Sequence, residues 1–454
     1  MRVSHGVTAV FDDPNLVSCA GLVPVLELAD RAGLPRLVAE HLRLTRLGGA
    51  NPQVKVPALV AGMVAGADSI DDMGLLRHGA LGRLMAGVRA PSTLGTFLRS
   101  FTFGHVRQLD AVAARLLAGL AGCTPVLAGA DELAYIDVDD TVRQTYGYAK
   151  QGAGRGYTGV KGLNALIATV STPSAAPVIA AARLRKGSTN SAKGAARLVA
   201  DALVTAKAAG ASGLRVLRAD SAFYRHDVIA ACRRHRTHFS ITARQDPAVR
   251  KAIATIDAGA WATIKYPNAI YDEDQQRWIS DAEVAEIPYT AFSSRPKDKH
   301  VTARLIVRRV PDLNPAHQHE LFTVYRHHAV FTNSPLPMLA AEAAHRAHAI
   351  IEQVIADLKN GPLAHLPSGQ FWANSAWLVC AAIAFNLTRA AGTLASAFHA
   401  RASTATIRAQ LITVPARLAR SARRLALHLP ANWPWEHAWQ RLFTGARHGP
   451  PLPA

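Results

Sequence analysis

The spacing of apolar positions divides the chain into three kinds of sequence. Over residues 1–130, apolar side chains recur every three or four positions, as in 22–44, and this period predicts amphipathic helices. A Gly-Leu-Pro break at 33–35 interrupts the first of these patterns. We therefore expect a helical N-terminal domain at 1–130.

Residues 131–245 change to short apolar runs and period-two alternation, which indicate strands separated by helices. The predicted order is three strands, a helix, a strand, a helix and a strand. In chain order these segments are 134–147, 162–172, 177–187, 191–210, 213–223, 225–236 and 237–245. Such an order is typical of an α/β domain.

The remainder of the chain is first strand-like and then helical. Residues 246–333 alternate and carry Trp and Tyr, so we expect a β-rich segment there, and residues 334–395 return to helix periodicity, with a helix at 340–361. The longest apolar run, 376–387, is well short of the ~20 residues that a membrane span needs, so a buried helix is expected. Residues 396–454 form an Arg-rich tail, which we expect to be helical.

Charge changes the picture from a generic α/β protein to one with a polyanionic partner. The chain has 454 residues and a formal net charge of +19. Most of the cations are arginines, which grip phosphate oxygens better than lysines do, so nucleic acid is the simplest partner. A codon bias toward Arg and Ala would also enrich arginine, but it would not deplete the acids. DNA binding is therefore expected of the N-terminal domain and the basic tail.

The cysteines argue against a zinc site. Four of them lie far apart, and no CxxC or Cys/His zinc spacing is present. Because the first residues also lack a hydrophobic signal core, we expect reduced, buried thiols in a cytoplasmic protein.

The stretch AYIDVDDTVRQTYG (134–147) combines a strand pattern with three aspartates, although Asp is depleted in strands. Alternation places Asp137, Asp139 and Thr141 on one face and Asp140 on the other, with the two carboxylates of the first face about 7 Å apart. Adjacent carboxylates repel unless they are neutralised, and Mg²⁺ or Mn²⁺ is the natural neutraliser. The alternative is that an aspartate caps a helix or turn.

Two further acidic residues, Asp220 and Glu352, occupy positions where a functional carboxylate could lie. Asp220 follows an apolar strand, where ligands of α/β sheets gather, although it could equally cap the next helix. Glu352 lies on a predicted helix in one polar stripe with His345, His348 and Lys359. The plainer interpretation of that stripe is a solvated face with a Glu–Lys pair.

Taken together, the blocks IDVDDT, RADSAF, IEQVIADLKNG and FWANSAWLVCAAIAFNLTR make the chain resemble a bacterial insertion-sequence DDE transposase. The resemblance covers residues 10–395 and is closest to the insertion-sequence family thirteen-eighty. It implies an RNase H-like mixed sheet flanked by helices, interrupted by a β-rich insertion at 246–333. Residues 131–245 and 334–395 would then be the two parts of one catalytic domain.

The resemblance also implies roles for particular residues. Asp139, Asp220 and Glu352 would be the catalytic acids and the ligands of two Mg²⁺ or Mn²⁺ ions. Asp139 is preferred as the first acid because the family pattern resembles Asp-x-Thr, and Asp137 is the fallback.

The relatives of this group often carry Tyr and Arg at the positions of His345 and His348. By resemblance, these two residues and Lys359 would contact DNA phosphate near the cleaved end. Glu352 and Lys359 match the group's spacing, whereas the two histidines depart from it.

The implied activity is cleavage at the ends of the element followed by strand transfer into target DNA. The element's terminal inverted repeats and the target DNA are then the partners, and holding two ends together implies a homodimer on DNA. Three other activities stay open: an RNase H-like nuclease without strand transfer, an inactive transposase-derived DNA-binding protein, and a carboxylate-based hydrolase of small molecules.

Overall fold

The computed structural model describes residues 5–448 except 46–47, 147–148, 157, 273–276, 312–324 and 423, with side chains described outside 266–280. Its internal contacts divide the chain into two compact units. We call them the helical unit (1–126, 145–151 and 357–454) and the sheet unit (127–144 and 152–356).

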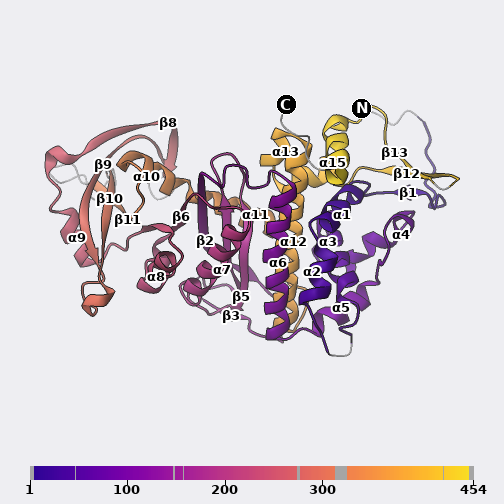
Figure 1. Ribbon diagram of the computed structural model, residues 1–454, viewed down its shortest axis with the longest axis horizontal. Coiled ribbons are helices and arrows are strands. Elements are labelled where there is room, and N and C mark those ends of the chain that lie inside the picture. Colours follow the sequence, from indigo (N-terminus) through magenta and orange to yellow (C-terminus); the bar gives the residue numbers. More distant parts are fainter. Residues whose placement is uncertain are drawn as a thin grey trace. The chain divides into compact units, whose positions relative to one another are not determined.

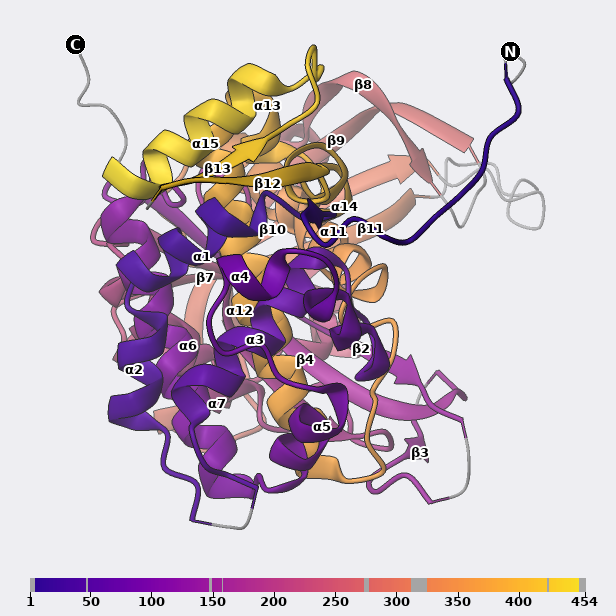
Figure 2. The same ribbon diagram turned by 90° about the vertical axis from the view of Figure 1, so that its right-hand side faces the viewer.

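The helical unit is built around one long apolar helix, α12 (Phe371–Ala395) (Figure 2). Its sequence is apolar on all sides, and a helix of that kind is stable only inside a core. Accordingly it packs against helices from both ends of the chain. The other helices of the unit are α1 (Leu22–Arg31), α2 (Leu34–His41), α3 (Pro52–Ala65), α4 (Leu81–Leu84), α5 (Pro91–Arg99), α6 (Phe103–Cys123), α13 (Ala397–Arg401), α14 (Thr404–Ile407) and α15 (Glu436–His448), with a 3₁₀ turn at Asp71–Arg77 and a π turn at Arg408–Ile412.

Within the described part of the chain, α12 is the one helix long and apolar enough to cross a membrane by length and composition. Its most apolar window is 94% buried inside the protein, as expected for a core helix. At the start of α12, both polar atoms of the Asn374 side chain bond the backbone of Ser368. The sequence-based expectation of a buried helix is thus confirmed, over a longer span than the apolar run suggested.

The basic tail is only partly helical. Strands β12 (Ala416–Ser421) and β13 (Arg424–His428) form an antiparallel hairpin, which pairs with the short strand β1 (Leu16–Val17) near the N-terminus. Alternation in ARLARS is too short to separate a strand from a helix by pattern alone.

The sheet unit contains a ten-stranded sheet with the order β3-β4-β2-β6-β7-β11-β10-β9-β8, in which β5 also pairs with β4 (Figure 1). The strands are β2 (Leu133–Gln144), β3 (Gly154–Arg155), β4 (Lys161–Ser171), β5 (Val178–Lys186), β6 (Leu214–Ala219), β7 (His238–Thr242), β8 (Ala262–Asp272), β9 (Arg277–Ala291), β10 (Val301–Pro311) and β11 (Tyr325–Thr332). The helices are α7 (Ala195–Ala208), α8 (His226–Arg234), α9 (Pro247–Ile253), α10 (Met338–Arg346) and α11 (Ile350–Lys359), of which the last three residues belong to the helical unit.

The five strands β5-β4-β2-β6-β7 form an RNase H-like sheet. β4 is antiparallel to both β2 and β5, whereas β2, β6 and β7 are mutually parallel. The parallel strands are joined through α7 and α8, which pack against each other, and α7 also packs on β4 and β5. The predicted fold class is confirmed, and so is the predicted order of strands and helices from 131 to 245, except that the two-residue strand β3 was not predicted.

The β-rich insertion continues the same sheet. β11 pairs antiparallel with β7, and β10, β9 and β8 follow outward in turn. The helix predicted at 340–361 is divided by a 3₁₀ turn at Ala347–Ala349 into α10 and α11. The compact units also differ from the predicted domain order, since residues 357–395 join the N-terminal helices.

Trp377 and Trp372 provide a test of the α12 core. Trp377 is fully buried and its indole N–H donates to the Pro362 carbonyl (2.6 Å), whereas Trp372 is 37% exposed. We expect Trp377→Ala to lower the free energy of unfolding by ~3–5 kcal/mol, because it leaves a large cavity and an unpaired carbonyl. Trp372→Ala, on the same helix, should cost clearly less. Urea unfolding of both variants measures the difference, and equal losses would contradict the assignment of α12 as the core.

Candidate active site

The first aspartate of β2 is neutralised by an arginine on the neighbouring strand. Asp137 is fully buried and forms a two-fold ion pair with Arg218 of β6, with distances of 2.6 Å from Nε to Oδ1 and 2.7 Å from Nη2 to Oδ2. Burial raises the pKa of Asp137, while the Arg218 charge opposes that shift. Arg218 also lies over the Tyr135 ring and donates to the Ala344 carbonyl of α10 (2.7 Å). The pair therefore connects β2, β6 and α10.

The third aspartate is neutralised on the opposite face. Asp140 is buried and accepts hydrogen bonds from Arg185 of β5 and from the Asn164 amide of β4. Arg185 in turn donates to the carbonyls of Ser191 and Lys193, just before α7. Every partner in this network is charged or polar, as burial of a carboxylate requires.

Asp139, between the two, has no ion pair among the described residues. Its carboxylate accepts the backbone N–H of Asp140 (2.7 Å). Partial burial raises the pKa of Asp139 to about 7, and the negative charges of Asp220, Asp140 and Glu352 add to the rise. The Asp139 carboxylate is thus surrounded by other negative charges and has no cationic partner among the described residues.

Asp220 lies beside Asp139, where β6 ends next to the middle of the longer parallel strand β2. Val138 pairs with Ala219 in the sheet, so the next residue of each strand, Asp139 and Asp220, occupies the same level about 4.8 Å apart between strands. One oxygen of Asp220 accepts the N–H of Ala222 (3.0 Å) and caps a 3₁₀ turn at Ser221–Phe223. Part of the Asp220 residue is exposed to solvent. The surrounding protein atoms nevertheless exclude water from its carboxylate, and this desolvation raises the pKa of Asp220. Asp220 therefore both caps this turn and stands beside the Asp139 carboxylate.

Glu352 approaches the pair from α11. Ile351, Val354 and Leu358, the apolar positions opposite the predicted polar stripe of this helix, are buried, and Glu352 is exposed on the other side. Its charge acts on Asp139. Lys359 ends the same helix seven residues later, in the part of the chain assigned to the helical unit.

The two histidines before Glu352 differ in position. His345 is buried, and its ring nitrogens lie 3.0 Å from the Ser240 hydroxyl and 2.9 Å from the Thr242 hydroxyl of β7. Burial and the His348 charge lower the pKa of His345 to about 3, so its ring is neutral. His348 is half-buried, stacks against His345 (4.8 Å between ring centres), and acts by charge on both Asp137 and Asp220. Only His348 of the pair is placed at the acidic cluster.

The chemistry of the three carboxylates fits a hard divalent cation, because Asp139 carries a raised pKa and no cation of its own. The described residues contain no group of three His, Cys, Asp or Glu side chains already placed to hold one ion. Mg²⁺ usually takes one or two carboxylates and completes its octahedron with water and substrate phosphate. Asp139, Asp220 and Glu352 therefore fit a divalent ion whose coordination is completed by substrate phosphate and water.

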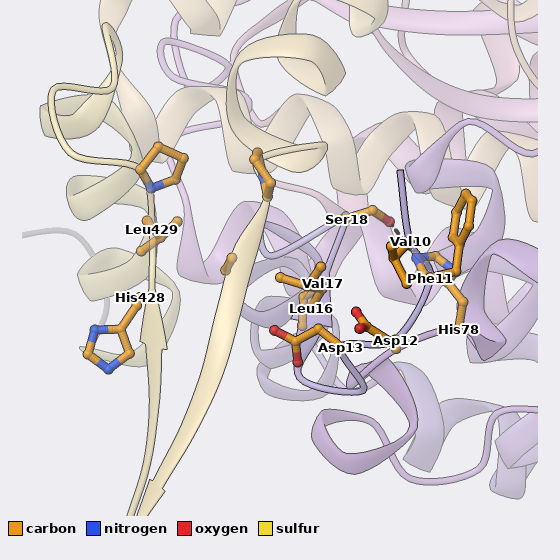
Figure 3. Close-up of a pocket in the computed structure, with 14 residues that line it drawn as sticks. Val10, Phe11, Asp12, Asp13, Leu16, Val17, Ser18, His78, His428 and Leu429 are labelled. Carbon is orange, nitrogen blue, oxygen red and sulfur yellow. Dashed lines mark hydrogen bonds between the residues drawn. The ribbon is translucent and has the colours of Figure 1, made fainter. Parts of the chain in front are cut away.

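A separate hollow of about 750 Å³ lies in the helical unit, between the N-terminal segment and the β12–β13 hairpin (Figure 3). In it the Ser18 hydroxyl lies 2.9 Å from Nε2 of His78. Asp13 on its wall accepts from Asn15 and Arg417 and so is engaged elsewhere. Its lining is mainly apolar, and it contains none of the three acids.

The comparison with known families now bears on this geometry. The family described as Transposase DDE domain group 1 matches residues 2–448, nearly the whole chain. The chain belongs to this transposase DDE family. No curated protein matches it significantly.

Membership of the transposase family makes DNA the partner and nucleotidyl transfer the class of reaction. It also confirms the resemblance to a DDE transposase that the sequence blocks suggest. The narrower assignment to the insertion-sequence family thirteen-eighty, the site residues and the ions stay predictions.

Sequence reasoning missed the two arginines that neutralise this transposase's acidic strand. Arg185 and Arg218 lie in the largely apolar strands VIAAARLRK and LRVLRA, which also carry Arg183, Lys186 and Arg215. A buried guanidinium is costly without a carboxylate, so an arginine within such a strand indicates a buried acidic partner. That signal was available, but it does not say which aspartate each arginine meets.

The neutralisation of Asp140 can be measured. Arg185→Met leaves a buried, unpaired carboxylate, and we expect it to lower the free energy of unfolding by ~3–5 kcal/mol. Arg197→Met is the matched control, because Arg197 is 72% exposed in its pair with Asp201 and should contribute at most ~1 kcal/mol. Urea unfolding compares them, and a similar small loss for both would show that the Arg185 pair is not needed for folding.

The crowding of Asp139 predicts a pH effect in metal-free protein. Because its pKa is raised from 3.8 to about 7, the folded state holds the proton more tightly. Below about pH 4, Asp139 is protonated in both the folded and the unfolded state, so its raised pKa does not change the free energy of unfolding. As the pH rises toward 7, the unfolded state loses this proton first, and the free energy of unfolding falls. Asp139→Asn should therefore stabilise the protein at pH 8, by on the order of 1–3 kcal/mol after allowance for exposure, and not at pH 4. Melting temperatures at both pH values measure this.

Asp131→Asn is the control for that experiment, since Asp131 is exposed just before β2. It should change the melting temperature equally at both pH values. A stabilisation by Asp139→Asn that does not depend on pH would contradict the charge crowding.

Proposed function

We propose that the chain is an insertion-sequence transposase, of the family thirteen-eighty type, which cleaves DNA at the ends of its element and joins them to target DNA. The observation that carries the proposal is Asp139: it alone of the three β2 aspartates has no arginine partner among the described residues, and the charges of Asp220 and Glu352 act on it. Nearly complete coverage by the transposase DDE family supports the same reaction.

Asp139, Asp220 and Glu352 would hold two Mg²⁺ or Mn²⁺ ions together with substrate phosphate. The chemistry that such ions supply when bound is a lower pKa for the attacking water or 3′-hydroxyl and a stabilised leaving 3′-oxygen. The protein's own contribution is the pairing of β2 with β6, which keeps the carboxylates of Asp139 and Asp220 adjacent. Asp137, the fallback first acid, is already neutralised by Arg218, so the proposal does not use it.

Other residues would support the substrate. His348 faces the acids and is the histidine we assign to a phosphate, together with Lys359 at the end of α11. Both ring nitrogens of His345 already have hydroxyl partners. We therefore assign His345 to holding the His348 ring, and a phosphate contact by His345 would require those bonds to break.

The rest of the proposed function concerns DNA and assembly. The net charge of +19 supports salt-sensitive binding along the DNA backbone, with the N-terminal helices and basic tail as contributors. A homodimer on the paired ends of the element, in the bacterial cytoplasm at the nucleoid, is part of the proposal. Inverted repeats in the DNA that flanks the gene would supply the substrate for its tests.

Asp220→Asn tests the acidic site. We expect cleavage of an end-bearing DNA to fall by ~10²–10⁴ or more, because the transition state loses metal-borne charge stabilisation. DNA binding should persist, and the rise in melting temperature on adding Mg²⁺ with DNA should shrink, which gives a readout independent of turnover. Asp131→Asn, which removes the same charge outside the site, should leave both measurements unchanged. Undiminished cleavage by Asp220→Asn would refute the assignment.

A strand-transfer assay separates the transposase from a nuclease with the same acids. Pre-cleaved ends with free 3′-hydroxyls are incubated with a supercoiled target plasmid and Mg²⁺. A transposase joins them, whereas a nuclease only hydrolyses DNA, and a protein that merely binds the ends does neither.

A further inference from the structure

A second concave site lies in the sheet unit, within the β-rich insertion. It is a hollow of about 610 Å³ between the end of α9 and the strands β10 and β11. Figure 1 shows these elements together at one end of the sheet. The side chains that line it are Gln245, Arg250, Ile253, Ala254, Ile256, Trp261, Arg309, Arg326, His327 and His328. Among the residues that the structure describes, its lining contains three arginines and two histidines, and no carboxylate.

One arginine of the hollow is held rigidly. Arg309 lies between two aromatic rings, 4.0 Å from the centre of Trp261 and 4.3 Å from that of Tyr325. Its Nε donates to Glu283 on β9 at 2.7 Å. A guanidinium fixed in this way loses little conformational entropy when a ligand binds beside it.

A second arginine is placed differently. Arg250 is exposed in the last turn of α9, and its side chain forms no ion pair among the described residues. His327 also lines the hollow, and burial and the Arg309 charge lower its pKa. The His327 ring therefore offers hydrogen bonds but carries no charge at neutral pH. The hollow thus combines a fixed cation, a cation that is available to a ligand, and a neutral polar ring.

Strand register places the hollow beyond the carboxyl ends of β6 and β7, with Arg309 and His327 on the face of the sheet opposite to Asp139 and Asp220. Ala219 pairs with Ile241 of β7, and Thr242 pairs with Val330 of β11, so the residues before Ala329 extend beyond the carboxyl ends of β6 and β7. Two strand spacings, about 10 Å, separate β6 from β11. A single stretch of chain spans the gap, because Arg244 donates to the Ser221 carbonyl next to Asp220, and Gln245 donates to the His327 carbonyl.

We propose that this hollow binds a backbone phosphate of the DNA that is held at the acids. The inference rests on the proposed function and adds to it a substrate contact made by the insertion. Arginine forks match phosphate oxygens, and a concave cationic lining favours an anion over a neutral ligand. Because β7 and β11 belong to one continuous sheet, the distance between the hollow and Asp220 is set by main-chain pairing.

The test compares two adjacent cations of α9. Arg250 lines the hollow, whereas Lys251, the next residue, does not. Binding of a short double-stranded DNA by the full chain is measured by fluorescence anisotropy between about 50 and 200 mM salt. We expect Arg250→Gln to reduce the slope of log K against log salt by about 0.9, the value for one lost phosphate contact. Arg250→Lys should keep the slope, and Lys251→Gln should leave it unchanged.

The outcomes separate this inference from the proposed function. Equal slopes for Arg250→Gln, Lys251→Gln and the unchanged protein, with normal cleavage by the unchanged protein, would overturn the phosphate contact alone. An equal decrease for the two Gln variants would also overturn it, because general charge would then explain the binding. Failure of the unchanged protein to bind or cleave DNA would overturn both. Circular dichroism melts of each variant confirm that a changed slope does not come from unfolding.

Discussion

The pairing of buried carboxylates with buried arginines is the interaction on which the acidic strand depends. β2 carries three aspartates within four residues at the centre of a sheet, where an uncompensated charge would cost several kcal/mol. Arg218 compensates Asp137 on one face and Arg185 compensates Asp140 on the other. Asp139 is left to face Asp220 and Glu352 without a cation of its own. The strand is tolerated because two of its three charges are neutralised internally.

The buried ion pairs also fix the segments around the acids. Arg218 extends past Asp137 to the end of α10, so the ion pair helps to fix the start of the segment that leads to Glu352. His345, one residue further, is bonded to two hydroxyls of β7 and supports the ring of His348. The acids thus stand on elements held by buried polar contacts, which restricts the movement needed to assemble a site.

The insertion is integrated into the same framework. Its strands continue the sheet from β7, so one hydrogen-bonded sheet carries both the acidic cluster and, on its opposite face, Arg309 and His327 of the cationic hollow. An insertion joined only by flexible linkers would not keep such a separation constant. In a polynucleotide enzyme, positive charge beside the acids also offsets the repulsion between carboxylates and phosphate.

Apart from the two-residue strand β3, local patterns in the sequence determined the strands and helices from β2 to β7, the buried face of α11 and the buried state of α12, because period and apolarity are properties of neighbouring residues. They also placed Asp139 and Asp220 on strands that are neighbours in the sheet, and Glu352 on a helix from which its charge acts on Asp139. Tertiary structure alone decided which aspartate lacks a partner: Arg185 and Arg218 are 45 and 81 residues from the carboxylates they meet. It likewise decided that His345 is buried while His348 faces the acids, and that the insertion extends the sheet. Burial and charge pairing follow from strand order, and strand order joins residues that no local pattern connects.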